Sequence, residues 1–113
     1  MTYLKELPAD LCGLKCLKKL IITNCHKLSV LPQEIGELSN LEVLRLRSCT
    51  SLESLTDSIA NLKNLDFLDI SDCFSIKELP KDIGQLRKLR TINMRQCERL
   101  KELPQSGILR IVH

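Results

Sequence analysis

Aromatic side chains are almost absent from this sequence of 113 residues, which has no tryptophan, one tyrosine and two phenylalanines. A hydrophobic core must therefore be built from leucine and other aliphatic side chains. Long apolar runs are absent as well, because none approaches the ~20 residues that a membrane-spanning helix needs, so we expect no membrane span. The formal net charge is +3, and basic residues are mixed with acidic ones without forming a block. This charge pattern, with no aromatic residues interleaved, argues against nucleic-acid binding.

Catalytic signatures are also missing. The sequence has no G-x-S-x-G, H-E-x-x-H or P-loop motif, and its histidines are His26 and His113. Cys25 beside His26 has the composition of a nucleophile and its base, but neighbouring side chains on an extended turn point in different directions. We therefore predict that the protein is not an enzyme, has no catalytic residue and uses no cofactor.

A 24-residue repeat, without any insertion, fills the sequence instead. Segments of equal length begin at Leu7, Leu31, Leu55 and Leu79, and a shorter one begins at Leu103. We predict a single domain. It consists of a partial repeat at 1–6, full repeats at 7–30, 31–54, 55–78 and 79–102, and a partial degenerate repeat at 103–113.

The chain begins inside a repeat. The letters "LKELP" at 4–8 match "IKELP" at 76–80 and "LKELP" at 100–104, which span the junction between one repeat and the next. We therefore expect the first coil to lack its strand, with no polar segment to cap it, although solenoid ends need capping for solubility. This favours a piece of a longer repeat array or a shortened relative of one, and it predicts self-association through the uncapped ends.

Every repeat carries the same apolar pattern. Residues 41–52 read L-x-x-L-x-L-x-x-C-x-x-L, which is the cysteine variant of the leucine-rich repeat. The alternation at Leu44 and Leu46 predicts a short strand with both leucines facing inward. Because corresponding strands are one full repeat apart in the same register, they must run parallel. Stacked coils then bury the leucines that one coil cannot bury alone.

The path between strands has signals of a short turn. Pro32 and Glu34 begin it, and Asn40 or, one repeat later, Asn64 ends it. We expect a helical or 3-10 turn with Pro32 as its first residue, Glu34 near the positive end of its dipole and the asparagine as its exit cap. The predicted fold is α/β: a leucine-rich-repeat solenoid with a curved parallel β-sheet on the concave face and short helical or 3-10 turns on the convex face.

Four of the six cysteines recur at the period of the repeat and form a ladder up the predicted stack: Cys25, Cys49, Cys73 and Cys97. Adjacent parallel strands are ~4.8 Å apart, so distance alone does not exclude disulfides. Position in the pattern favours buried, reduced thiols that act as small apolar residues with a weak S–H donor. Metal is the alternative, because His26 and the pair Cys12 and Cys16 offer soft ligands. Zinc spacing of the C-x-x-C kind is absent, however, and we predict no metal site.

The same cysteines bear on the cellular compartment. A reduced ladder suits the cytosol, and no asparagine lies in an N-x-[ST] glycosylation sequon. We therefore predict a cytoplasmic protein.

The repeat also resembles a known family. The segments "LIITNCHKLSVLPQEIGELSNLEVLRLRSCTSLESL" and "FLDISDCFSIKELPKDIGQL" are similar to the leucine-rich repeats of plant intracellular NLR disease-resistance proteins. They look closest to the helper class with a mildew-resistance-type coiled-coil domain. The resemblance implies a non-catalytic protein-interaction module of innate immunity, used for recognition, autoinhibition or signalling contacts. Its partners would be other domains of such a receptor or an immune-signalling protein.

The chain departs from that family because it contains no nucleotide-binding switch. Nucleotide exchange and the assembly it drives therefore do not carry over. The alternative to the immune role is a generic intracellular leucine-rich-repeat scaffold.

Any function of this kind depends on surface residues. Solenoids bind partners on the concave sheet, and the outward strand positions predict a protein-binding set: Arg45, Arg47, Phe67, Asp69, Asn93 and Arg95. Arg45 and Asp69 could equally form a cross-strand pair that only balances charge. Phe67 has less structural reason to face outward, and aromatic residues often anchor interfaces.

Overall fold

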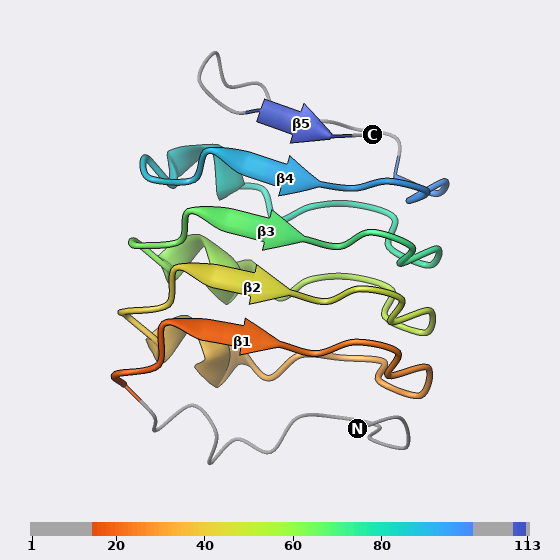
Figure 1. Cartoon of the computed structure of the whole chain (residues 1–113), viewed down its shortest axis with the longest axis horizontal. Helices are drawn as coiled ribbons and strands as arrows, with labels where there is room; N and C mark the ends of the chain where they lie inside the picture. Colours follow the sequence, from red (N-terminus) through yellow and green to blue (C-terminus); the bar gives the residue numbers. More distant parts are fainter. Residues whose placement is uncertain (1–14, 101–109, 113) are drawn as a thin grey trace.

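The computed structural model describes residues 15–100 and the backbone of 110–112. Its five strands form one parallel sheet in chain order, and every strand lies beside the next one (Figure 1). The strands are β1 (Lys19–Ile21), β2 (Val43–Arg45), β3 (Phe67–Asp69), β4 (Thr91–Asn93) and β5 (Arg110–Val112). Short 3-10 turns lie behind the sheet: η2 (Gln33–Glu37), η3 (Asp57–Asn61) and η4 (Ile83–Gln85).

This architecture confirms the predicted solenoid. Leu44 pairs with Leu20 on one side and with Leu68 on the other, so each step along the sheet is one complete repeat. The last step is shorter, because Arg110 of β5 pairs with Thr91. The shortening falls where the fifth repeat loses its pattern. No helix in the described ranges is long and apolar enough to cross a membrane.

The 3-10 turns correct one detail of the sequence prediction. Pro32 is the residue before η2, with an extended backbone (φ −68°, ψ 145°), and not its first helical residue. Its carbonyl oxygen accepts a hydrogen bond from the Ile35 N–H at 3.1 Å. A proline with extended ψ can supply this first acceptor without itself entering the turn, and it has no N–H to leave unpaired.

The asparagines also act differently from the prediction. The residues that follow η2 and η3 as C-caps are Leu38 and Leu62, so Asn40 and Asn64 are not exit caps. Their side-chain amides donate instead to the preceding coil, Asn40 to the Lys15 carbonyl and Asn64 to the Ser39 carbonyl, each at 2.8 Å. The asparagine therefore joins its coil to the preceding one and does not cap the 3-10 turn, which has already ended.

The core is the leucine stack that the repeat predicts. Leu44, Leu68 and Ile92 have no exposed surface, and even Leu20, at the start of the described stack, is only 9% exposed. Each such side chain stabilises the fold by roughly 1.5–3 kcal/mol when it is fully buried. Leu4 and Leu7, which the uncapped-end prediction concerns, lie outside the described residues.

One residue in every coil has a left-handed backbone, although none of them is glycine. These residues directly precede the ladder cysteines, with φ between 58° and 61°: Asn24, Ser48, Asp72 and Gln96. Asparagine and aspartate tolerate this conformation better than serine or glutamine do. The repeated left-handed turn points each cysteine side chain back into the core.

Candidate functional site

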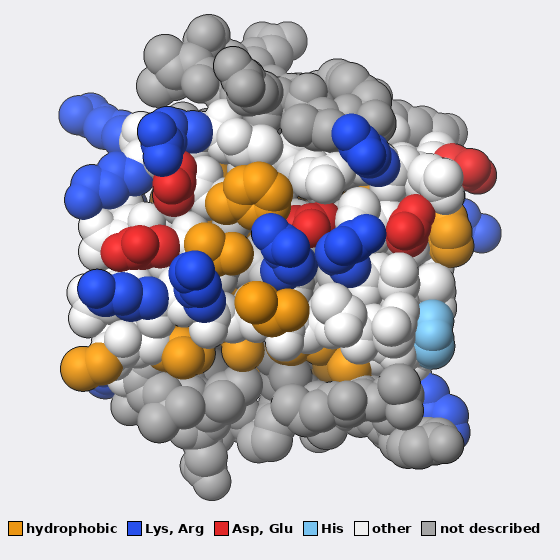
Figure 2. Space-filling view, viewed as in Figure 1, with side chains coloured by type: hydrophobic (Ala, Val, Ile, Leu, Met, Phe, Trp, Pro, Cys, Tyr) orange, Lys and Arg blue, Asp and Glu red, His pale blue; other side chains and the backbone are white. Residues whose placement is uncertain are grey.

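The outward side chains of the strands form rows across the sheet, as the register requires. Arg45, Asp69 and Asn93, all members of the predicted set, are paired neighbours in one row. Phe67 lies between Val43 and Thr91 in the row beside it. We call the exposed side of β1–β4 the sheet face. Figure 2 shows basic side chains gathered around an acidic one in the middle of this face, with apolar side chains beside them.

Asp69 is the centre of this arrangement, and it is buried. Its side chain is 4% exposed, while Arg45 and Arg47 extend over it with 37% and 52% of their side chains exposed. Asp69 Oδ2 lies 3.5 Å from the Arg45 Nε and 3.9 Å from the Arg47 Nε. One carboxylate therefore neutralises only part of the charge of two guanidinium groups.

The other oxygen of Asp69 is held by the backbone and by Ser71. Asp69 Oδ1 accepts hydrogen bonds from the Ser71 N–H at 3.0 Å and from the Ser71 hydroxyl at 2.7 Å. Ser71 is itself only 3% exposed. The sequence pattern places both residues facing outward, but longer neighbours cover them. Asp69 thus positions the arginines, and a partner would meet Arg45 and Arg47 first.

Phe67 supports the arginines from the adjacent row. The Arg45 Cζ lies 5.4 Å from the centre of the Phe67 ring, within the range of a cation–π contact. Ile21 on β1 leaves 57% of its surface exposed, which adds apolar area to the same face. Arginine and aromatic side chains in contact, next to aliphatic surface, are the usual composition of a protein-binding hot spot.

Asn93 and Arg95 continue the predicted set on β4. Asn93 Oδ1 accepts from the Arg95 N–H at 3.3 Å, the contact that Asp69 makes with the Ser71 N–H one coil earlier. Asn93 is partly exposed and Arg95 is exposed. We name Arg45, Arg47, Phe67 and Asp69 the sheet-face patch, and Asn93 and Arg95 lie at its border.

The cysteine ladder lies inside the stack, beyond the strand ends. Cys25, Cys49 and Cys73 have no exposed surface, and Cys97 is 8% exposed. The thiols of Cys73 and Cys97 donate to carbonyl oxygens of the preceding coil, at 2.7 Å to Leu46 and 2.9 Å to Ile70. No cysteine in the described part of the chain forms a disulfide.

The position of these carbonyls explains the choice of cysteine. Leu46 and Ile70 lie just past their strands, where their N–H groups still donate to the next coil, to Asp69 and Asn93. The thiol of the next coil supplies the matching donor for their carbonyl groups. A continued strand would have needed another backbone N–H there, but the chain has already turned.

Burial favours the protonated form of a thiol. It raises the pKa of Cys97 from 9.0 to about 11. Interaction with Cys49, together with burial, raises the pKa of Cys73, and the same interaction lowers the pKa of Cys49 to about 7. Thiols with a raised pKa, such as those of Cys73 and Cys97, are poor nucleophiles and poor metal ligands. Residues 15–100 contain no group of three or more His, Cys, Asp or Glu side chains placed to hold a metal ion.

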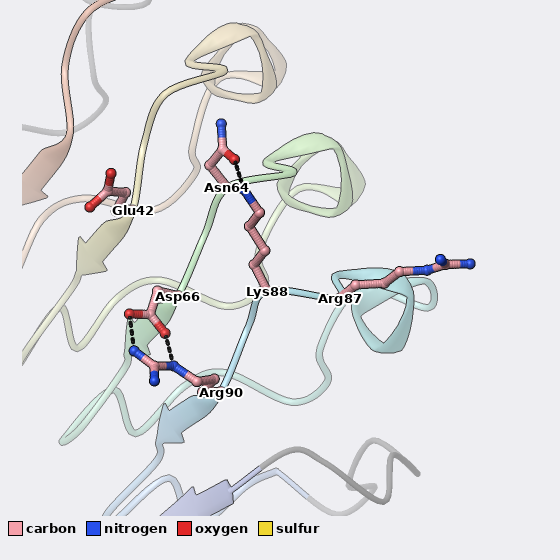
Figure 3. A pocket seen from close by; sticks show the side chains of 6 residues that line it. All are labelled: Glu42, Asn64, Asp66, Arg87, Lys88 and Arg90. Atoms are coloured by element: carbon pink, nitrogen blue, oxygen red, sulfur yellow. Dashed lines mark hydrogen bonds and ion pairs between the residues drawn. The ribbon is translucent and has the colours of Figure 1, made fainter.

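A second surface, which the sequence analysis missed, lies where the strands begin. A hollow of about 380 Å³ is lined there by Glu42, Asn64, Asp66, Arg87, Lys88 and Arg90 (Figure 3). Arg90 holds Asp66 through two hydrogen bonds of 2.7 and 2.9 Å, which lower the pKa of Asp66 and raise that of Arg90. The three basic residues among them lie in one short run of the fourth coil, Arg87-Lys88-Leu89-Arg90, and the other three come from the two preceding coils. Reading the repeats column by column would have revealed them.

Comparisons with known proteins agree with the geometry. No family model and no curated protein matches the chain, but solved structures do. The leucine-rich repeat domain of the type III effector XopL superposes with a TM-score of 0.87 and 32% identity, over 97% of this chain and 38% of that one. A Leptospira interrogans LRR protein gives a TM-score of 0.62 and 31% identity, over 89% of this chain and 34% of that one. The chain therefore spans well under half the length of either protein.

Proposed function

We propose that this leucine-rich-repeat solenoid is a non-catalytic protein-binding module whose contact surface is the sheet-face patch. The observation that supports it is the placement of Arg45 and Arg47 over one buried carboxylate, with Phe67 beneath Arg45. The leucine pattern does not require these residue types. Two guanidinium groups that share a single aspartate retain hydrogen-bonding capacity and positive charge toward the outside.

The geometry favours a protein partner that offers a carboxylate beside an apolar side chain. A guanidinium group binds a carboxylate through paired hydrogen bonds, and the apolar group would rest on Phe67 and Ile21. The coils have no insertion that could close over a small ligand, so a broad and modest interface fits better than a pocket.

Peptide selection tests this proposal without knowledge of the natural partner. Displayed random peptides are selected on the folded chain, and their affinities are then measured against Phe67→Ala, Arg47→Glu and, as a control, Lys81→Glu. Lys81 is exposed and lies next to η4, away from the sheet. We expect acidic and apolar residues to be enriched together, and both sheet-face variants to weaken binding about tenfold or more.

The opposite pattern would contradict the proposal. Peptides that lose affinity with Lys81→Glu, and keep it with Phe67→Ala and Arg47→Glu, would place the interface on the turn side. Circular dichroism of each variant separates lost binding from lost folding, since none of the three side chains lies in the leucine core.

The proposal also includes an immune role and a location in the cytosol. The repeat resembles plant NLR receptors in its residues, whereas the two solved structures are a type III effector domain and a Leptospira protein, and neither is a plant receptor. A generic leucine-rich-repeat scaffold agrees equally well with those structures. The DNA directly upstream distinguishes the two, because a reading frame that encodes a P-loop nucleotide-binding region would support the receptor.

A further inference from the structure

The two flanks of the sheet differ in charge. The strand-start flank, residues 15–18, 39–42, 63–66 and 87–90, carries six basic side chains and the two acidic ones of Glu42 and Asp66. The strand-end flank, residues 24–29, 48–53, 72–77 and 96–100, carries three of each sign. Figure 2 shows the basic side chains clustered on the left, where the strands of Figure 1 begin. A one-sided field of this kind attracts acidic partners.

The hollow in the strand-start flank arises where the fourth coil departs from the repeat. Asn40 and Asn64 join their coils to a preceding backbone carbonyl, but the equivalent residue of the next coil is Lys88, which donates to the Asn64 Oδ1 at 2.8 Å. The acidic positions Glu42 and Asp66 are likewise followed by Arg90. The fold does not need these replacements, because the two preceding coils stack without them.

The walls of the hollow carry charges that the described residues do not neutralise. Asp66 and Arg90 are paired with one another, and Lys88 donates to the neutral amide of Asn64. Within residues 15–100, no carboxylate forms an ion pair with Arg87 or Lys88, and no cation pairs with Glu42. Figure 3 shows Arg87 pointing away from the other lining residues and Glu42 at the opposite side from Lys88.

We propose that this hollow is a second docking surface, for an acidic protein segment that also carries a basic residue. Carboxylates of the segment would contact Arg87 and Lys88, and its basic side chain would contact Glu42. A nucleic acid offers phosphates but no cation for Glu42, and the six residues that line the hollow include no aromatic side chain for bases to stack on. None of its lining residues belongs to the sheet-face patch, and the proposal does not depend on the function of that patch.

Defined probes test this surface on the complete chain. Isothermal titration calorimetry at low ionic strength would compare a short glutamate-rich peptide containing one lysine, its all-acidic analogue and an oligothymidylate. We expect Lys88→Glu or Arg87→Glu to lower the affinity for the lysine-containing peptide about tenfold. Lys77→Glu makes the same change of charge on the strand-end flank and should lower this affinity less than about twofold.

Glu42→Lys identifies the class of ligand. It should weaken the binding of the lysine-containing peptide, because the lysine of that peptide loses Glu42 as its partner. It should strengthen the binding of the all-acidic peptide, because its carboxylates gain a basic side chain to contact. Tighter binding of both peptides and of oligothymidylate to Glu42→Lys would mean that the surface attracts any polyanion, and would overturn the proposal. Equal losses with Lys77→Glu and Lys88→Glu, or no measurable binding of the peptides, would overturn it as well. Phe67→Ala should leave all these affinities unchanged, which separates this result from the test of the sheet-face patch.

Discussion

Asp69 lies beneath Arg45, with its Oδ2 at 3.5 Å from the arginine Nε and its side chain 4% exposed. The aspartate is therefore inaccessible to a partner, while the arginine above it remains partly open. The same carboxylate faces Arg47 and accepts hydrogen bonds from Ser71. A buried acid on the outward row of a strand determines how two exposed basic side chains are presented.

Replacing this acid with its amide should reveal that role. Asp69→Asn keeps an oxygen for Ser71 but leaves Arg45 and Arg47 close together without an anion. We expect the free energy of unfolding to fall by about 1–3 kcal/mol, measured by urea denaturation. Adding Arg47→Gln should recover part of the loss, because it removes the repulsion. An Asp69→Asn variant as stable as the wild type would show that the pair contributes nothing.

Two glycines at equivalent positions of the repeat should differ in their tolerance of alanine. A Cβ added to Gly36 would lie 2.6 Å from the Ser58 carbonyl oxygen and 2.8 Å from the Ser58 Cβ. A Cβ added to Gly84 would meet no atom of the described residues within 4 Å. Gly36→Ala should therefore destabilise the protein by about 1–3 kcal/mol, and Gly84→Ala should be neutral or slightly stabilising. Thermal melts of the two variants give the comparison, and equal melting temperatures would contradict the close approach of η2 to η3.

The left-handed residues offer a way to stabilise the chain. Gln96 is exposed and has a φ of 61°, a conformation that costs a residue with a Cβ roughly 1 kcal/mol. Gln96→Gly should raise the free energy of unfolding by about 0.5–1 kcal/mol. Gln85→Gly is the matched control, since Gln85 lies in η4 and glycine should destabilise it by a similar amount. A loss of stability in both variants would show that the strain at Gln96 is negligible.

The buried thiol of Cys97 predicts a loss of stability at alkaline pH. The pKa of Cys97 is raised from 9.0 to about 11 in the folded chain, so the unfolded chain releases this proton first. The contribution of Cys97 is complete below pH 9 and declines as the pH rises toward 11, by about 2–3 kcal/mol at the upper end. Urea denaturation at a series of pH values should show this decline, and Cys97→Ala should reduce its slope. An unchanged slope in that variant would mean that the thiol ionises equally in both states.

The repetitive part of the structure could be predicted from the sequence. The pairing of Leu44 with Leu20 and Leu68 follows from the exact period of the repeat, and so does the row of Arg45, Asp69 and Asn93. These features depend on one physical requirement, that identical coils bury identical leucines. The burial of Cys73 follows for the same reason, although its donation to Leu46 requires knowledge of where the strand ends.

The features that could not be predicted depend on side-chain length and on contacts between coils. The pattern makes Asp69 an outward residue, but two longer arginines cover it. Asn40 occupies a position that suggests a cap, yet its amide reaches the preceding coil. The hollow beside Lys88 comes from residues that differ from the repeat pattern in a single coil. A prediction based on what the repeats share does not include such residues.

The hydrogen bonds from side chains to the backbone of a neighbouring coil run in one direction through the described stack. Asn64 donates to Ser39, Ser75 to Thr50 and Cys97 to Ile70, so the later coil supplies the donor and the earlier one the acceptor. The stack therefore has a polarity, and its two ends are chemically unlike. A whole coil could be added or removed inside the array with every donor still opposite an acceptor. Deleting a single residue would instead move the asparagine, serine and cysteine donors out of line with their acceptors. The unit in which such a chain can change length is the coil.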